Sequence, residues 1–173
     1  MSKSGVRELD HFPPQPHRPE YVRRLYDAFR AHLAKNGLRL TEQRRLILDY
    51  FLGAERHVSQ DEIYTALRPR GLGRATVFRT LKMLEQAGLV NHLSGSGGIP
   101  RFELNLERPH HDHLICVDCG RIQEVSWPKL ERIQERSCRE AGFTPKWHRH
   151  EVFGLCRDCG RRRASPSASS KPI

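Results

Sequence analysis

The stretch GRATVFRTLKMLEQAGLVNHLSGSGGIPRFEL, residues 73–104, decides the fold of the first half of the chain. Its first half predicts a helix, residues 73–88, with Val77, Leu81 and Leu84 on one apolar face. The other faces carry Thr76, Arg79, Thr80 and Met83. Gly88 ends this helix, and LVNHL and IPRFEL then predict two strands joined by the small-residue loop SGSGG. A helix followed by such a hairpin is typical of a winged helix.

Three further helices are predicted upstream. Pro19 suits a first helical turn, and Gly37 lies just beyond the end of the first helix. Its apolar positions recur at helical spacing, at Val22, Leu25, Tyr26, Phe29 and Leu33. Thr41 can cap a second helix that stops at Gly53, and its apolar face consists of Leu46, Ile47, Tyr50 and Phe51.

A short third helix completes a helix-turn-helix. Ser59 and Glu62 form the S-x-x-E pattern of a capping box, and Pro69 ends the helix. The following helix would then present Thr76 and Arg79 to base edges, with Arg74 and Lys82 nearer to phosphates. The alternative is that these side chains form the solvated face of an ordinary core helix. The predicted wing, the helix order and a formal net charge of +10 favour DNA binding.

Two pairs of cysteines indicate a metal site in the second half. CVDCG holds Cys116 and Cys119, and CRDCG holds Cys156 and Cys159. Four thiolates at this spacing can enclose Zn²⁺ in a tetrahedral shell, and the intervening chain is long enough for a strand, a helix and another strand. Redox chemistry is the competing interpretation of a single C-x-x-C motif. Cys138, on a helix predicted over residues 128–141, is expected to serve packing.

The stretch HHDHLICV, residues 110–117, offers ligands for two different sites. In a strand, His111 and His113 share one face, whereas His110 and Asp112 share the other. If the VDCG knuckle is a hairpin turn, the return strand RIQEV brings Glu124 opposite His113, within one residue of register. Imidazole and carboxylate ligands suit Fe²⁺, Mn²⁺, Co²⁺ or Zn²⁺ without choosing among them. A catalytic metal is the weaker alternative, since the chain has no H-E-x-x-H motif and no nucleophile signature.

Composition sets the remaining expectations. The 173 residues contain no apolar run long enough to cross a bilayer, and the N-terminal stretch lacks the apolar core of a signal peptide, so a cytoplasmic protein is expected. We expect a flexible arm over residues 1–18, a winged-helix domain over 19–104 and a hinge over 105–109. A metal-binding domain over 110–160 and a disordered basic tail over 161–173 would follow.

These residues together resemble the ferric uptake regulator family, from about residue 22 to Gly160. The most specific pieces are ATVFRTL, HHDHLICVDCG and CRDCG in that order. The resemblance implies an α+β fold, with an N-terminal winged helix-turn-helix and a C-terminal α/β dimerisation domain containing the four-cysteine zinc site. It also implies a homodimer that binds a double-stranded DNA operator, without membrane association, and that represses transcription when it binds a regulatory metal. The chain would not be an enzyme.

The resemblance also assigns residues. The regulatory metal would be bound by His57, Glu103, His111, His113 and Glu124, and an additional site would consist of His110, Asp112, Glu131 and His148. The DNA-binding residues would be Arg39, Arg74, Thr76, Phe78, Arg79 and Lys82, and Phe78 departs from the tyrosine usual in the family. Zinc would be structural, and Fe²⁺, replaceable by Mn²⁺, Co²⁺ or Zn²⁺, would be regulatory.

The iron assignment follows from two glutamates. Peroxide-sensing relatives carry Asp at a carboxylate position that is Glu here, and zinc-sensing relatives place a cysteine in the sensory site, so Glu103 and Glu124 favour ferrous iron and the control of metal-uptake genes. A zinc-, manganese- or peroxide-sensing member is the alternative within the family. A zinc-dependent nucleic-acid hydrolase and a purely structural zinc protein are alternatives of other classes.

Overall fold

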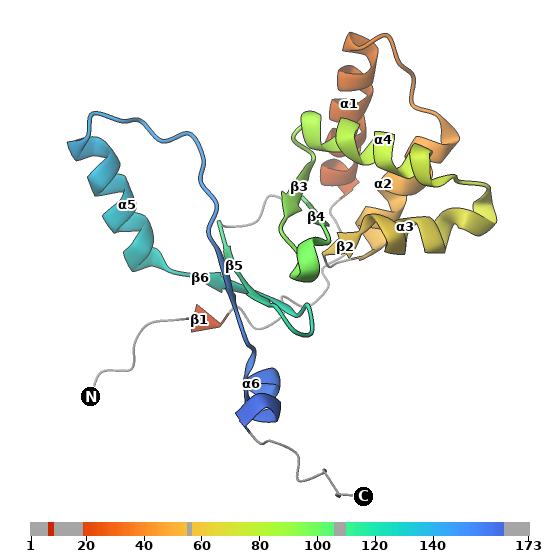
Figure 1. Cartoon of the computed structure of the whole chain (residues 1–173). Coiled ribbons are helices and arrows are strands. Elements are labelled where there is room, and N and C mark those ends of the chain that lie inside the picture. Colours follow the sequence, from red (N-terminus) through yellow and green to blue (C-terminus); the bar gives the residue numbers. More distant parts are fainter. Residues whose placement is uncertain (1–6, 9–18, 55–56, 106–109, 165–173) are drawn as a thin grey trace, which may run out of the picture. The chain divides into compact units, whose positions relative to one another are not determined.

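The computed structural model describes residues 7–8, 19–54, 57–105 and 110–164, and the chain divides into two compact units (Figure 1). The first unit contains the helices α1 (Pro19–Lys35), α2 (Glu42–Ala54), α3 (Gln60–Leu67) and α4 (Arg74–Gln86). It also contains the strands β2 (Val58–Ser59), β3 (Val90–Leu93) and β4 (Arg101–Leu104), and the 3-10 turn η1 (Arg68–Arg70). The loop between β3 and β4 contains the 3-10 turn η2 (Ser96–Gly98), of which residues 96–97 group with the second unit. This is the predicted winged helix.

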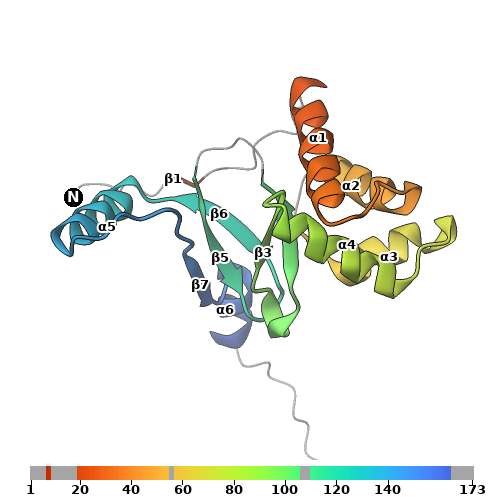
Figure 2. The ribbon, with the colours of Figure 1, turned by 90° about the horizontal axis from the view of Figure 1, so that it is seen from above.

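The local signals of the first unit act as the sequence predicts. The Ser59 hydroxyl accepts a hydrogen bond from the Glu62 backbone N–H at 3.1 Å, and the Glu62 carboxylate accepts one from the Ser59 N–H at 2.6 Å. This capping box starts α3 directly after the last residue of β2. Gly88, at φ 68°, takes the left-handed conformation that ends α4 and turns the chain into β3. Helices α3 and α4 lie side by side in both views (Figures 1 and 2).

The core of this unit lies between its helices and its small sheet. The apolar face of α4 is buried as predicted, and the sheet has the order β2-β4-β3. The core also contains Leu25, Phe29, Leu33, Ile47, Leu48, Phe51, Ile63, Val90 and Phe102. Two sequence predictions need correction. Thr80, predicted on an outer face of α4, is 1% exposed, because it lies three residues after Val77 and one before Leu81. Leu48, which lies outside the apolar face predicted for α2, is fully buried.

The second unit is built on a four-stranded sheet of order β1-β6-β5-β7. Its elements are β1 (Arg7–Glu8), β5 (Asp112–Cys116), β6 (Ile122–Ser126), α5 (Pro128–Glu140), β7 (Glu151–Gly154) and α6 (Arg157–Ala164). β5 is antiparallel to β6 and parallel to β7. The predicted strand, helix and strand between the two cysteine pairs are therefore β6, α5 and β7.

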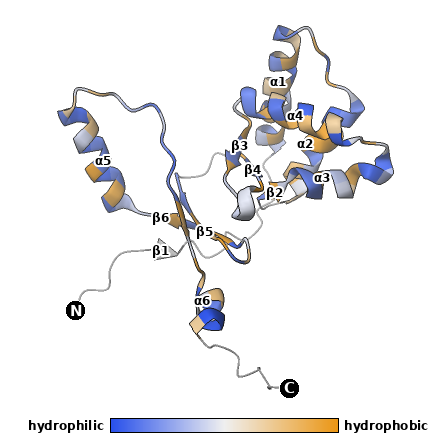
Figure 3. Ribbon diagram, viewed as in Figure 1, coloured by the Kyte–Doolittle hydropathy of each residue, from blue (hydrophilic) through white to orange (hydrophobic). Residues whose placement is uncertain are grey.

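Several large apolar side chains of the second unit are not covered by any described part of the chain. α5 buries none of its residues, although hydrophobic and hydrophilic residues alternate along it (Figure 3). The exposed large apolar residues of this unit include Ile133, Phe143, Trp147, Val152 and Phe153. An apolar surface of this kind is expected to be covered by another molecule.

The expected arm, hinge and tail fall mostly outside the described residues. Arg7 and Glu8, expected to belong to a flexible arm, instead form β1 and pair with β6. Residues 1–6, 9–18 and 106–109 are not described. α6 extends to Ala164, so the basic residues 161–163, predicted to begin a disordered tail, belong to a helix. Residues 165–173 lie outside the described part of the chain.

Candidate metal centres and nucleic-acid interface

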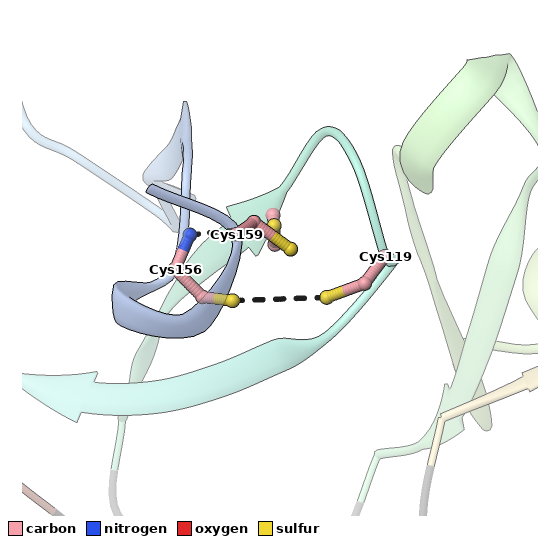
Figure 4. Close-up of side chains that lie close together, drawn as sticks. Cys119, Cys156 and Cys159 are labelled. Atoms are coloured by element: carbon pink, nitrogen blue, oxygen red, sulfur yellow. Dashed lines mark hydrogen bonds between the residues drawn. The ribbon is translucent and has the colours of Figure 1, made fainter. Parts of the chain in front are cut away.

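The four predicted cysteines converge in the second unit. Cys116 ends β5, and Cys119 lies in the turn before β6. Cys156 directly precedes α6, and Cys159 lies in the first turn of that helix. Their sulfur atoms all lie within 4.8 Å of one another, and Cys119 Sγ and Cys156 Sγ are 3.8 Å apart (Figure 4). The described cysteines form no disulfide. Four sulfurs brought together in this way suit Zn²⁺, whose structural sites are tetrahedral and closed.

The surroundings of the thiols differ. Hydrogen bonds from the backbone N–H groups of Cys119 and Cys156 lower the pKa of Cys116 to about 6, so its thiolate is the favoured form at neutral pH. Burial raises the pKa of Cys159 to about 12, although Arg162 Nη2 donates to its sulfur at 2.7 Å. Cys116 would therefore bind a zinc ion as a thiolate that is already deprotonated, whereas binding through Cys159 would release a proton.

Two ion pairs join the cysteine pairs reciprocally. Asp118 lies between Cys116 and Cys119, and Arg163 Nε contacts its carboxylate at 2.9 Å. Asp158 occupies the equivalent position between Cys156 and Cys159, and Arg121 Nη2 contacts it at 2.9 Å. Each acid thus pairs with an arginine that follows the other cysteine pair. Solvent exposure weakens such pairs, but together they align the two segments around the four sulfurs.

One face of β5 and β6 carries the predicted regulatory ligands of the second unit. His113 is paired with Glu124 across the antiparallel ladder, which is the register predicted from the hairpin. His111 Nε2 lies 4.0 Å from Glu124 Oε1, and the rings of His111 and His113 meet edge to face with centroids 5.0 Å apart. The strand parity therefore places these three side chains together.

The first unit contributes a second pair of the same type. His57 Nε2 lies 3.1 Å from Glu103 Oε2, and both side chains are only 12–13% exposed. His57 directly precedes β2 and Glu103 lies on β4, where Val58 pairs with Phe102. Asn91 Nδ2 donates to the other Glu103 oxygen at 3.4 Å. Only the family resemblance indicated these residues, because a single histidine before a two-residue strand gives no periodic signal.

The opposite face of β5 gathers the predicted additional ligands. His110 Nε2 lies 3.1 Å from Asp112 Oδ1, and His148 Nε2 lies 3.0 Å from Glu131 Oε2. His110, Asp112, Glu131 and His148 each offer a ligand atom, and these atoms lie within 4.8 Å of one another. Asp112 is 1% exposed, and its Oδ2 has no hydrogen bond among the described residues. A buried carboxylate oxygen left without a partner is costly, so this donor set fits a cation.

The predicted DNA-contacting side chains lie mainly on the exposed side of α4. Phe78 is 50% exposed, and Arg79 is exposed without an ion pair to any described acid. Arg74, by contrast, contacts Asp61 and stacks over the Tyr64 ring at 4.2 Å, so it fastens α4 to α3. Lys82 is paired with Glu85 at 2.9 Å. Thr76 is half-buried, and Arg39 is exposed in the loop before α2.

Comparisons with known proteins show the family to which the chain is similar. A sequence model of the Ferric uptake regulator family matches residues 35–153. The chain is 34% identical to the ferric uptake regulation protein of Campylobacter jejuni over 144 residues, which cover 81% of this chain and 91% of that protein. It is 33% identical to the peroxide-responsive repressor PerR of Staphylococcus epidermidis over 131 residues, which cover 75% and 86%.

A solved structure shows a similar fold. The ferric uptake regulator Fur of Helicobacter pylori, described as having three functional metal binding sites, is 27% identical and superposes with a TM-score of 0.72. The match covers 86% of this chain and 96% of that one.

Proposed function

This chain belongs to the ferric uptake regulator family, and from that premise we propose that it is a homodimeric, metal-activated transcriptional repressor with ferrous iron as its co-repressor. Proteins of this family are metal-responsive transcription regulators and not enzymes. No observation supports the nucleic-acid hydrolase alternative. None of the helices in the described ranges is long and apolar enough to span a membrane.

The observation that carries the proposal is a matched pair of ligand sets. His57 and Glu103 face each other in the winged helix, and His111, His113 and Glu124 gather on the second unit. Both sets consist of imidazoles and carboxylates without thiolate. We propose that one regulatory metal is shared by the two sets, as the family pattern implies. When bound, the ion supplies a Lewis-acid centre that accepts their lone pairs.

The choice of iron depends on the ligands and not on the overall similarity. Relatives of both kinds match this chain: ferric uptake regulation proteins are 34% to 40% identical to it, and the peroxide-responsive repressor of Staphylococcus epidermidis is 33% identical. Imidazole and carboxylate ligands suit Fe²⁺ and also Mn²⁺, Co²⁺ or Zn²⁺. In the family pattern, the glutamates Glu103 and Glu124 favour ferrous iron, because the predicted regulatory ligands include no cysteine. The four-cysteine cluster would hold a separate, structural Zn²⁺.

The proposed dimer follows from the uncovered apolar surface of the second unit. α5 buries no residue within the chain, and Trp147 is 81% exposed. A second copy of this unit would cover this surface and place two copies of α4 at a fixed spacing for two DNA half-sites. Sharing one metal between the two ligand sets would favour the conformation of the dimer that fits DNA. The free energy by which metal binding strengthens DNA binding then equals the difference in metal affinity between this conformation and the one that does not fit DNA.

DNA affinity measured with and without each divalent metal tests this proposal. A duplex selected from a random pool should bind about 5- to 150-fold more tightly when Fe²⁺ or Mn²⁺ is added to the zinc-containing chain, which corresponds to about 1 to 3 kcal/mol of coupling. Binding should be measured under anaerobic conditions at fixed salt. An affinity that ignores both metals would mean a purely structural zinc protein, and metal-dependent cleavage of the duplex would mean a hydrolase.

The exposed arginine of α4 gives a prediction about specificity. Arg79→Ala should lower affinity for the selected duplex more than for random DNA, by about 1 to 3 kcal/mol, if Arg79 makes a bidentate contact with a base. Competition binding with both duplexes measures the difference. Lys82→Ala is the matched control on the same helix and should weaken both complexes about equally. Equal losses for the two duplexes with Arg79→Ala would show that Arg79 contacts only phosphate.

A further inference from the structure

The additional ligand cluster has a neighbour that neither the sequence patterns nor the family pattern included. β5 and β7 run parallel with His113 paired to Glu151. The residues one step earlier, Asp112 and His150, are therefore neighbours, and both point to the face opposite His113. His150 Nδ1 lies 3.3 Å from Asp112 Oδ1, the same oxygen that contacts His110.

The ring of His150 lies beside the additional cluster. Its ring centroid lies 5.0 Å from that of His148, whose Nε2 contacts Glu131. His150 Nδ1 is buried and makes no hydrogen bond of normal geometry with any described residue, and the same holds for Asp112 Oδ2. Asp112 Oδ1 already has His110 Nε2 at hydrogen-bond distance, at 3.1 Å. A buried imidazole nitrogen that faces the same carboxylate without a hydrogen bond of its own leaves its lone pair available to a cation between them.

We propose that His150 is a further ligand of the additional metal and binds it through Nδ1. The cluster then offers three imidazoles, from His110, His148 and His150, and two carboxylates, from Asp112 and Glu131. This inference rests on the proposed additional site. Its consequence concerns metal preference, because structural zinc is almost always four-coordinate, whereas five protein ligands demand a higher coordination number. The cluster therefore suits Fe²⁺, Mn²⁺ or Co²⁺ in a five- or six-coordinate arrangement.

Cobalt binding to the full-length, zinc-containing chain tests the assignment. His111→Ala combined with His113→Ala removes regulatory ligands, so Co²⁺ in this background reports on the additional cluster. Co²⁺ is paramagnetic and shifts the ring protons of each histidine that binds it. With histidine-labelled protein, the background chain should show shifted signals from three histidines. Signals from only two would overturn the assignment of His150, and this measurement needs no substitution at residue 150.

The matched variant is His150→Asn. Its side-chain amide nitrogen can still donate a hydrogen bond to Asp112 but does not replace an imidazole as a ligand. It should remove one set of shifted signals and weaken Co²⁺ binding by at least about tenfold, with the dimer and the zinc content unchanged. An affinity equal to that of the background would show that His150 only orients Asp112. If the background chain binds no Co²⁺ at all, the additional site itself is wrong, whatever the role of His150.

Discussion

Cys116→Ser is expected to abolish tight zinc binding and the stable dimer together, and Cys159→Ser should do the same. Both cysteines are buried, and their sulfurs join the end of β5 to the start of α6. A structural Zn²⁺ can contribute on the order of 10 kcal/mol to folding, which is comparable to the whole stability of a small domain. Losing one thiolate should therefore unfold much of the second unit.

Zinc content and dimer mass, measured on the same sample, check this expectation. Cys138→Ser is the matched control, because Cys138 lies on α5 and belongs to no ligand cluster among the described residues. It should keep both zinc and dimer. A folded, dimeric Cys116→Ser protein with one zinc per chain would show that the four cysteines do not form a zinc site.

The second large effect separates the two faces of β5. Replacing His111 and His113 with Ala should leave the zinc, the dimer and weak metal-free DNA binding in place. It should remove the gain in DNA affinity on adding Fe²⁺ or Mn²⁺, a loss of about 1 to 3 kcal/mol of coupling. The physical reason is that His111 and His113 lie on the same face of the sheet as Glu124, whereas the additional cluster lies on the opposite face.

Replacing His110 and Asp112 with Ala is the matched experiment on the opposite face. Their partners Glu131 and His148 lie within the second unit, so this variant should lose more dimer stability and less activation by metal. Both double variants should be titrated with metal against the selected duplex, with dimer content followed in parallel. Two variants that respond to metal like the parent, or a loss of response confined to the His110 and Asp112 variant, would mean that the sensory assignment is wrong.

Elementary patterns were sufficient for much of this architecture. The alternation of strand side chains assigned His111 and His113 to one face and His110 and Asp112 to the other, and the knuckle turn fixed His113 opposite Glu124. The cysteine spacing likewise predicted the four-sulfur cluster. These patterns succeed because the spacing of side chains along a strand or a tight turn follows from local backbone geometry alone.

Other features depend on contacts that no local pattern encodes. β1 and β2 contain two residues each, too few for alternation to be visible, and both exist through pairing with distant strands. His57 meets Glu103 only because β2 joins β4. His150 was missed although it follows His148 at strand spacing, since its role depends on the parallel register of β7 with β5. Two-residue strands, and ligands that come together only through strand pairing, therefore could not be predicted from local sequence patterns.

The pairing of β1 with β6 has a thermodynamic consequence. β1 precedes α1 in the chain, so the winged helix is inserted in the sequence between β1 and β5 of the second unit. The pairing of β1 with β6 therefore closes a loop of polypeptide that includes the whole winged helix. Closing a loop costs chain entropy that rises with its flexible length. When the winged helix folds, most of that flexible length becomes a compact body, and closure of β1 on β6 costs less. Folding of the inserted unit should therefore stabilise the sheet of the other through the polypeptide itself, as a linkage that requires no side-chain contact between them.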